Sequence, residues 1–172
     1  LALTCTTTSG TISASSSTAG VTYAWSGAGI VSGGTTSSPT VNAAGTYTVT
    51  VTNPANGCTN TTTVAVTSNT TPPNVTAGSP LALTCTTTSG TISASSSTAG
   101  VTYAWSGAGI VSGGTTSSPT VNAAGTYTVT VTNPGNGCTN TTTVAVTSNT
   151  TPPNITAGSP LTLTCTTTSC LF

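Results

Sequence analysis

Residues 45–58 read GTYTVTVTNPANGC, and this stretch recurs at residues 125–138 with one substitution. In its first half, Tyr47, Val49 and Val51 alternate strictly with threonines. A period of two is typical of a half-buried β-strand. The turn formers NPANG then break the pattern, and a second alternating run follows the cysteine. The stretch therefore predicts a β-hairpin with a cysteine at its exit.

The hairpin is part of a repeat that covers the whole chain. Residues 1–80 match residues 81–160 at all but two positions, and a third copy begins at Leu161. A period of 80 residues is longer than solenoid units of roughly 20 to 50 residues and falls within the size range of a small domain. Tandem domains are therefore predicted. The third copy departs from the repeat at residues 170–172, where CLF has no physical explanation.

Paired prolines mark the predicted domain boundaries, because they fix φ and stiffen a short connection. The pairs follow Thr71 and Thr151. We expect residues 1–71 to form a repeat that lacks its first strand, residues 72–151 to form a complete repeat, and residues 152–172 to start a third. This offset indicates an excerpt of a longer array, although a strand exchanged between neighbouring subunits would produce the same offset.

Each repeat predicts about seven short strands at spacings of roughly 8 to 12 residues, a pattern typical of an all-β sandwich. No helical periodicity occurs. Tyr23 and Trp25 could form an aromatic platform for a sugar. They lie on the same face of the predicted strand as Val21, however, which favours a place in the core. The predicted structural core residues are Trp25, Tyr47, Trp105 and Tyr127.

The composition excludes several classes of function. The 172 residues include no Lys, Arg, Asp, Glu or His, whereas an ordinary domain has about a quarter charged residues. Nucleic acids and anionic membranes are normally bound through Lys and Arg, and a nucleophilic serine or cysteine needs a nearby base. We therefore expect no enzyme, no cofactor, no metal site and no nucleic-acid partner. The apolar runs are far shorter than the roughly 20 residues that span a bilayer, so no membrane insertion is expected.

The six cysteines, without histidine or a C-x-x-C pair, favour disulfides in an oxidising, extracytoplasmic compartment over zinc. A disulfide between Cys85 and Cys138 would close a loop of about 53 residues and stabilise the fold by roughly 4 kcal/mol. One between Cys58 and Cys85 would close about 27 residues and contribute roughly 3.5 kcal/mol, so loop entropy does not decide between the two pairings. We predict the intra-domain pairs Cys5 with Cys58 and Cys85 with Cys138, because Cys58 opens a final strand that continues before the linker begins. Cys165 would then pair with a cysteine beyond the printed end.

The hairpin tyrosine, preceded by AAGT, resembles the tyrosine corner of immunoglobulin-like sandwiches. The run GTYTVTVTNPANGCTNTTTVAV, with LTC upstream and YAWSG between, resembles the Ig-like and PKD-like repeats of giant Bacteroidetes surface adhesins, including gliding-motility adhesins. The resemblance implies tandem immunoglobulin-like sandwiches, export by type IX secretion and display as extracellular filaments on the cell surface. It also puts the four cysteines on the family's cysteine positions. Related repeats commonly carry Asp where this chain has Asn53 and Asn133, so a calcium site is not implied.

Near-perfect repetition without a reactive site favours a structural function. Our leading hypothesis is a stalk or filament segment of a secreted bacterial cell-surface adhesin, giving reach for attachment or gliding, with neighbouring repeats as its partners. One alternative is a module whose Ser- and Gly-rich loops, such as residues 26–34, bind a glycan, a surface or a protein. Another is a self-assembling extracellular fibre in which an edge strand passes between subunits.

Overall fold

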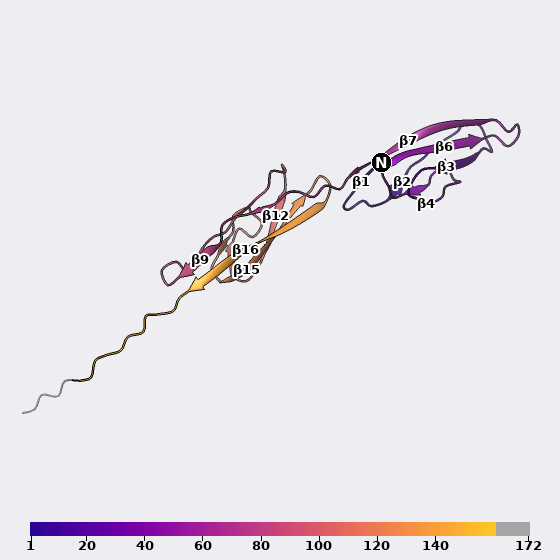
Figure 1. The fold of residues 1–172 in the computed structure, drawn as a ribbon. Helices are drawn as coiled ribbons and strands as arrows, with labels where there is room; N and C mark the ends of the chain where they lie inside the picture. The colour runs from indigo at the N-terminus through magenta and orange to yellow at the C-terminus, as the bar shows by residue number, and fades with distance from the viewer. Residues whose placement is uncertain (161–172) are drawn as a thin grey trace, which may run out of the picture.

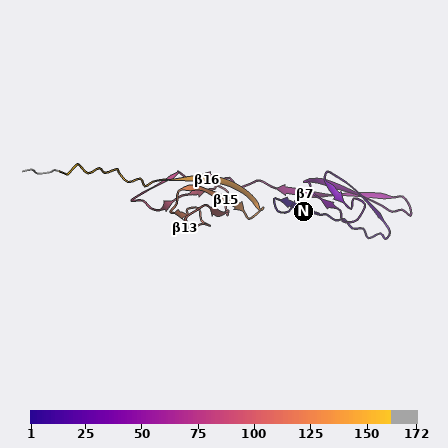
Figure 2. The same cartoon turned by 90° about the horizontal axis from the view of Figure 1, so that it is seen from below.

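A computed structural model describes residues 1–160, so Cys165 and the ending at residues 170–172 lie outside the described part of the chain. Within that part, every regular element is a β-strand. The strands form two sandwiches that follow one another along a line, and both views show the chain leaving the second sandwich as an extended segment (Figure 1, Figure 2). The chain is thus all-β, a tandem of immunoglobulin-like sandwiches.

The first sandwich consists of strands β1 to β7, in a larger sheet of order β1-β7-β6-β3 and a smaller sheet of order β2-β5-β4. Its strands are β1 (Ala2–Thr4), β2 (Gly10–Thr11), β3 (Thr22–Ser26), β4 (Ile30–Ser32), β5 (Thr40–Val41), β6 (Gly45–Thr52) and β7 (Thr59–Asn69).

The second sandwich consists of strands β8 to β16, in sheets of order β12-β15-β16-β9 and β10-β14-β13 and in the short pair β11-β8. Its strands are β8 (Thr76–Ala77), β9 (Leu81–Thr84), β10 (Gly90–Thr91), β11 (Ala94–Ser95), β12 (Thr102–Ser106), β13 (Ile110–Ser112), β14 (Thr120–Val121), β15 (Gly125–Asn133) and β16 (Cys138–Asn149). Strands β8 and β11 have no counterpart in the first sandwich.

The predicted hairpin is β6 and β7, which pair in antiparallel register from Gly45 with Val66 to Thr52 with Thr59. Its turn is closed by two backbone bonds, from Asn53 N–H to Cys58 O (2.9 Å) and from Gly57 N–H to Asn53 O (2.8 Å). Gly57 has a φ of +71°, a conformation that only glycine adopts without a steric cost. The turn sequence therefore sets the register of the two strands.

The alternating residues of the hairpin form the core. Tyr47 is 0% and Trp25 8% exposed in a cluster of apolar side chains between the two sheets. The Tyr47 hydroxyl lies within hydrogen-bond distance of Ala43 O (2.8 Å) and of Ala28 O, and Trp25 Nε1 donates to Thr36 O (2.9 Å). Since the Trp25 ring is buried, it offers no flat face to a sugar. Trp105 and Tyr127 make the equivalent contacts in the second sandwich.

The predicted cysteine pairs are wrong, because the short strand that precedes the first cysteine of each sandwich runs parallel to the last strand. In the second sandwich Thr84 lies opposite Asn149, the final residue of β16, so Cys85 lies where β16 ends. Cys138 is the first residue of that 12-residue strand, and about 3.3 Å per residue puts the two strand ends about 36 Å apart. A disulfide requires Cα atoms within about 7 Å. Cys85 therefore cannot pair with Cys138, and the same topology separates Cys5 from Cys58.

Candidate functional site: the joint between the sandwiches

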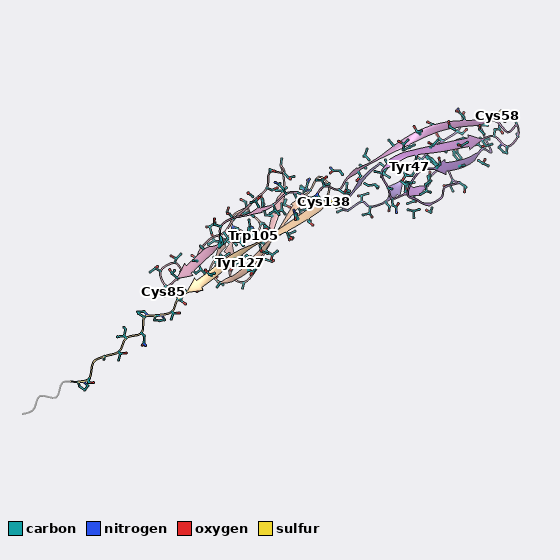
Figure 3. The ribbon with its side chains drawn as sticks, in the orientation of Figure 1. Tyr47, Cys58, Cys85, Trp105, Tyr127 and Cys138 are labelled. Carbon is teal, nitrogen blue, oxygen red and sulfur yellow. A yellow bond between two sulfur atoms is a disulfide. The ribbon has the colours of Figure 1, made fainter. Side chains whose placement is uncertain are left out.

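The disulfide observed in the described residues joins Cys5 of the first sandwich to Cys138 of the second. The Cα atoms are 5.0 Å apart and the cysteines are separated by 133 residues in sequence. Figure 3 shows Cys138 between the two sandwiches, with Cys58 at the far tip of the first and Cys85 at the opposite end of the second. Within residues 1–160, Cys58 and Cys85 have no disulfide partner and both are exposed.

Asn136, in the hairpin turn of the second sandwich, is buried against the first sandwich at 3% exposure. Its Nδ2 donates to Asn69 Oδ1 (3.0 Å) and to Thr71 O (3.0 Å), both in the preceding repeat. Its backbone carbonyl accepts from Cys5 N–H (3.1 Å), and its Oδ1 accepts from Cys138 N–H (3.0 Å). A buried amide is stable only when its polar atoms are paired, so the position of Asn136 depends on the first sandwich.

Gly137 lets the two sandwiches approach closely beside the disulfide. A Cβ at this position would lie 2.4 Å from Thr6 Cγ2, and its φ is +68°. The equivalent Gly57 has nearly the same φ, +71°, but no atom within 4 Å of a built Cβ. The same turn is therefore covered in the second sandwich and open in the first.

The connection between the sandwiches is bound to the second sandwich rather than free in solvent. Pro73 is fully buried, and its carbonyl accepts from Asn140 Nδ2 (3.0 Å). Val75 packs against the second core, and β8 pairs with β11. The segment thus completes the second sandwich as well as linking it to the first.

Asn74 fixes this segment with its side-chain amide. Its Oδ1 accepts from Ser97 N–H (3.0 Å), Thr98 N–H (3.2 Å) and Ser96 Oγ (3.0 Å). Its Nδ2 donates to Ser97 Oγ (2.7 Å). In a chain without carboxylates or cationic side chains, amide and hydroxyl groups provide these polar contacts at the joint.

The first sandwich has a pocket of about 500 Å³ at its free tip. Its lining includes residues equivalent to those that hold the connection and the disulfide in the second sandwich: Ser16, Ser17, Thr18, Asn56, Cys58 and Asn60. Ala14 is half-buried where Ala94 is 3% exposed, and Cys58 is exposed where Cys138 is 1% exposed. Because the sequences around these positions are nearly identical, the difference comes from the neighbouring segment that only the second sandwich has.

The joint brings together one member of each predicted cysteine pair and leaves the other two cysteines apart. Sequence reasoning missed the amide contacts of Asn74, Asn136 and Asn140, and it treated the prolines as a spacer. The signal available in the sequence was the near-identity of the two hairpin turns and of the two linkers, which favours a joint that repeats with the same period.

No protein-family model and no curated protein matches this chain. Similar solved structures include Drosophila OTK extracellular domains 3–5, at 13% identity and a TM-score of 0.44, covering 87% of this chain and 59% of that chain. Another is the three N-terminal domains of the bacteriophage RB49 highly immunogenic outer capsid protein, at 19% identity and a TM-score of 0.46, covering 81% of this chain and 54% of that chain. The chain thus spans between half and two thirds of these solved chains. Its described residues form no helix capable of crossing a membrane.

Proposed function

We propose that this chain is a segment of a stiff extracellular stalk or filament of a bacterial cell-surface adhesin. The observation that carries the proposal is the joint, where the Cys5–Cys138 disulfide adds a second covalent connection between consecutive sandwiches. Relative motion is the default expectation for domains joined by a short linker. Here the disulfide and the buried Asn136 restrict that motion, which suits a molecule that must hold a distance.

The contacts at the joint act on separate parts of the chain. Cys5 and Thr6 meet the hairpin turn of the second sandwich, whereas Asn69 and Thr71 are bound through Asn136. Several attachment points resist bending better than a single linker does. The two sandwiches accordingly lie end to end (Figure 1).

The chemistry of the chain supports an extracellular, non-enzymatic role. Disulfides persist in oxidising compartments, and the sequence has no side chain that could act as a charged general base. A surface without charged side chains lets neighbouring filaments approach without electrostatic repulsion. We take residues 1–71, 72–151 and 152–172 as the repeating units of such a stalk. Its assignment to the gliding-motility adhesins of Bacteroidetes, exported by type IX secretion, rests on the sequence resemblance.

Small-angle X-ray scattering of the full chain tests the stiffness of the joint. We expect the oxidised protein to show a narrow distribution of end-to-end dimensions. The double variant Cys5→Ser/Cys138→Ser should broaden it, and the control Cys58→Ser/Cys85→Ser should not. Indistinguishable profiles for all three proteins would contradict a role of the disulfide in stiffness.

Antibody labelling of intact cells of the source organism tests the location. We expect labelling without permeabilisation, and loss of the label after brief protease treatment of the cells. A label that appears only after permeabilisation would contradict the surface role.

A further inference from the structure

The extended segment that follows the second sandwich differs by a single residue from a segment bound inside that sandwich. Residues 152–157 read PPNITA and residues 72–77 read PPNVTA. Residues 150–160 have no regular secondary structure and all are exposed. Ile155 is 87% exposed, whereas its counterpart Val75 packs against the second core. Among the described residues, Ile155 therefore lacks the apolar packing that Val75 has.

The pocket at the tip of the first sandwich matches this segment. In the second sandwich, Asn74 is held by Ser96, Ser97 and Thr98, and the Pro73 carbonyl by Asn140. The counterparts of these four binding residues, Ser16, Ser17, Thr18 and Asn60, all line the pocket.

Two apolar residues of the first core, one of which lines the pocket, are also less completely covered than their counterparts. Val51 and Val64 are only partly buried, whereas Val131 and Val144 are 0% and 2% exposed. The second sandwich has the Val75 segment packed on it, and none of the residues 1–160 takes the equivalent place on the first. Filling the pocket would bury this apolar surface, which is favourable.

The two exposed cysteines have almost the same neighbouring sequences as the two cysteines of the observed disulfide. Cys85 is equivalent to Cys5, and residues 81–89 repeat residues 1–9 without change. Cys58 is equivalent to Cys138, in a turn that differs only by Ala55. The end of the second sandwich therefore has the sequence that contributes Cys5 to the observed joint. The tip of the first sandwich has the turn that contributes Cys138 to it.

We propose that the pocket of the first sandwich binds residues 152–157 of a second copy of this chain, and that Cys85 of that copy forms a disulfide with Cys58. This interaction goes beyond the proposed stalk function, because it follows from the joint alone and holds wherever the protein is located. It names both the site and its occupant.

The occupant comes from a second copy because the chain's own segment cannot reach the pocket. Cys58 and Cys85 lie at opposite ends of the two sandwiches (Figure 3). Pro152 follows Asn149 by three residues, a reach of about 10 Å, whereas each sandwich is about 36 Å long by its last strand. The contact is thus head-to-tail between unlike ends, and a contact of this kind that does not close into a ring produces a filament.

The covalent step needs an oxidant, and a low-molecular-weight disulfide such as oxidised glutathione supplies it. The Cys58 thiolate attacks the small disulfide, forms a mixed disulfide and releases one small thiol. The Cys85 thiolate of the neighbouring copy then displaces the second small thiol. Two protein thiols are oxidised, one small disulfide is reduced to two thiols, and the joint gains one S–S bond.

The experiment uses the full chain with Cys165→Ser and Cys170→Ser, so that four cysteines remain, incubated with oxidised glutathione. We expect non-reducing electrophoresis to show a ladder of dimers, trimers and longer species. Cys58→Ser and Cys85→Ser should each remain monomeric alone, and their mixture should give a dimer. A dimer in either variant alone, or no ladder in the parent chain, would overturn the head-to-tail pairing.

The crosslink is identified by mass spectrometry of chymotryptic peptides, because a chain without Lys or Arg has no trypsin sites. The Cys58 peptide contains Ala55 where the Cys138 peptide contains Gly135, so fragment spectra distinguish them. The mixture of Cys58→Ser and Cys85→Ser should yield a crosslink that contains Ala55. A dimer whose digest contains the Gly135 crosslink but none with Ala55 would show exchange at the existing joint and overturn the assignment.

A tail variant tests the pocket separately from the cysteines. Ile155 is exposed, so Ile155→Asp leaves both sandwiches folded, which circular dichroism verifies. We expect this variant to form the ladder at least tenfold more slowly than the parent chain, whereas Thr150→Asp, before the proposed segment, should have little effect. Equal rates for all three proteins would overturn residues 152–157 as the occupant. Either result is independent of the stiffness experiment, which tests the Cys5–Cys138 disulfide, and of the location experiment, which tests where the protein is displayed.

Discussion

Asn56 and Asn136 occupy the same position in two nearly identical turns, yet only Asn136 is buried. Both accept a bond from the cysteine N–H two residues later, at 3.0 Å in each turn. Asn136 alone donates to a neighbouring repeat, through Asn69 and Thr71. A comparison of the two asparagines therefore distinguishes the contribution of this side chain to its own turn from its contribution to the contact between the sandwiches.

We expect Asn136→Ala to destabilise the oxidised chain by about 1 to 3 kcal/mol more than Asn56→Ala, because it breaks the bonds to Asn69 and Thr71 and leaves the N–H of the buried Cys138 unpaired, whereas Cys58 is exposed. Urea unfolding measures each loss through the tryptophan of the same sandwich: Trp105 in a Trp25→Phe background for Asn136→Ala, and Trp25 in a Trp105→Phe background for Asn56→Ala. Equal losses in both variants would show that Asn136 contributes only to its turn.

Gly137 and Gly57 provide a second matched pair. Both have positive φ, so alanine should cost roughly 1 to 2 kcal/mol at either position. Only Gly137→Ala also displaces Thr6 beside the disulfide, so we expect it to speed reduction of Cys5–Cys138 by dithiothreitol several-fold. Free-thiol titration over time measures the rate. Unchanged reduction in Gly137→Ala would contradict the close packing of Thr6 on this turn.

The disulfide should limit how far the chain lengthens under force. Cys5 and Cys138 enclose 133 residues, which include most of both sandwiches. At about 3.5 Å per residue, the closed loop shortens the length to which the unfolded chain can be stretched by roughly 470 Å. Single-molecule pulling from the two termini should recover this length when dithiothreitol is added. Cys5→Ser should show the full length without reductant, and the same extension in the oxidised parent chain would contradict an intact joint.

Stability should be nearly independent of pH between about 4.5 and 7. Stability changes with pH only where the folded and unfolded states bind different numbers of protons. The chain has no Asp, Glu or His, so no such difference arises from side chains of these types. We expect the melting temperature to vary by less than about 2 °C over this range. Differential scanning calorimetry measures it, and a fall of several degrees at the acid end would contradict the prediction.

The sequence predicted the sandwich well because its signals are local. The alternation of Tyr47, Val49 and Val51 decides which side chains face the core, and it needs only a period of two. The turn formers after Thr52 set the hairpin register through glycine conformation and backbone bonds. One of the two carbonyls within reach of the Tyr47 hydroxyl, Ala43 O, is only four residues away.

The joint could not be predicted in the same way. The prediction assumed that the two cysteines of a repeat lie near one another, but the parallel pairing of β9 with β16 puts Cys85 and Cys138 at opposite ends of a sandwich. Strand direction is a property of the assembled sheet, and alternation along a strand is the same whichever way its neighbour runs. The buried state of Asn136 likewise depends on a repeat that lies far away in sequence.

The sequence by itself determined the strands, the hairpin, the inward-facing residues and the absence of charged side chains, because each is fixed by neighbouring residues or by composition. Only the tertiary structure decided the partner of Cys5, the burial of Asn136 and the pocket at the tip of the first sandwich. The physical reason is that two nearly identical repeats acquire different surfaces when, within residues 1–160, only the second has a preceding repeat bound to its hairpin turn.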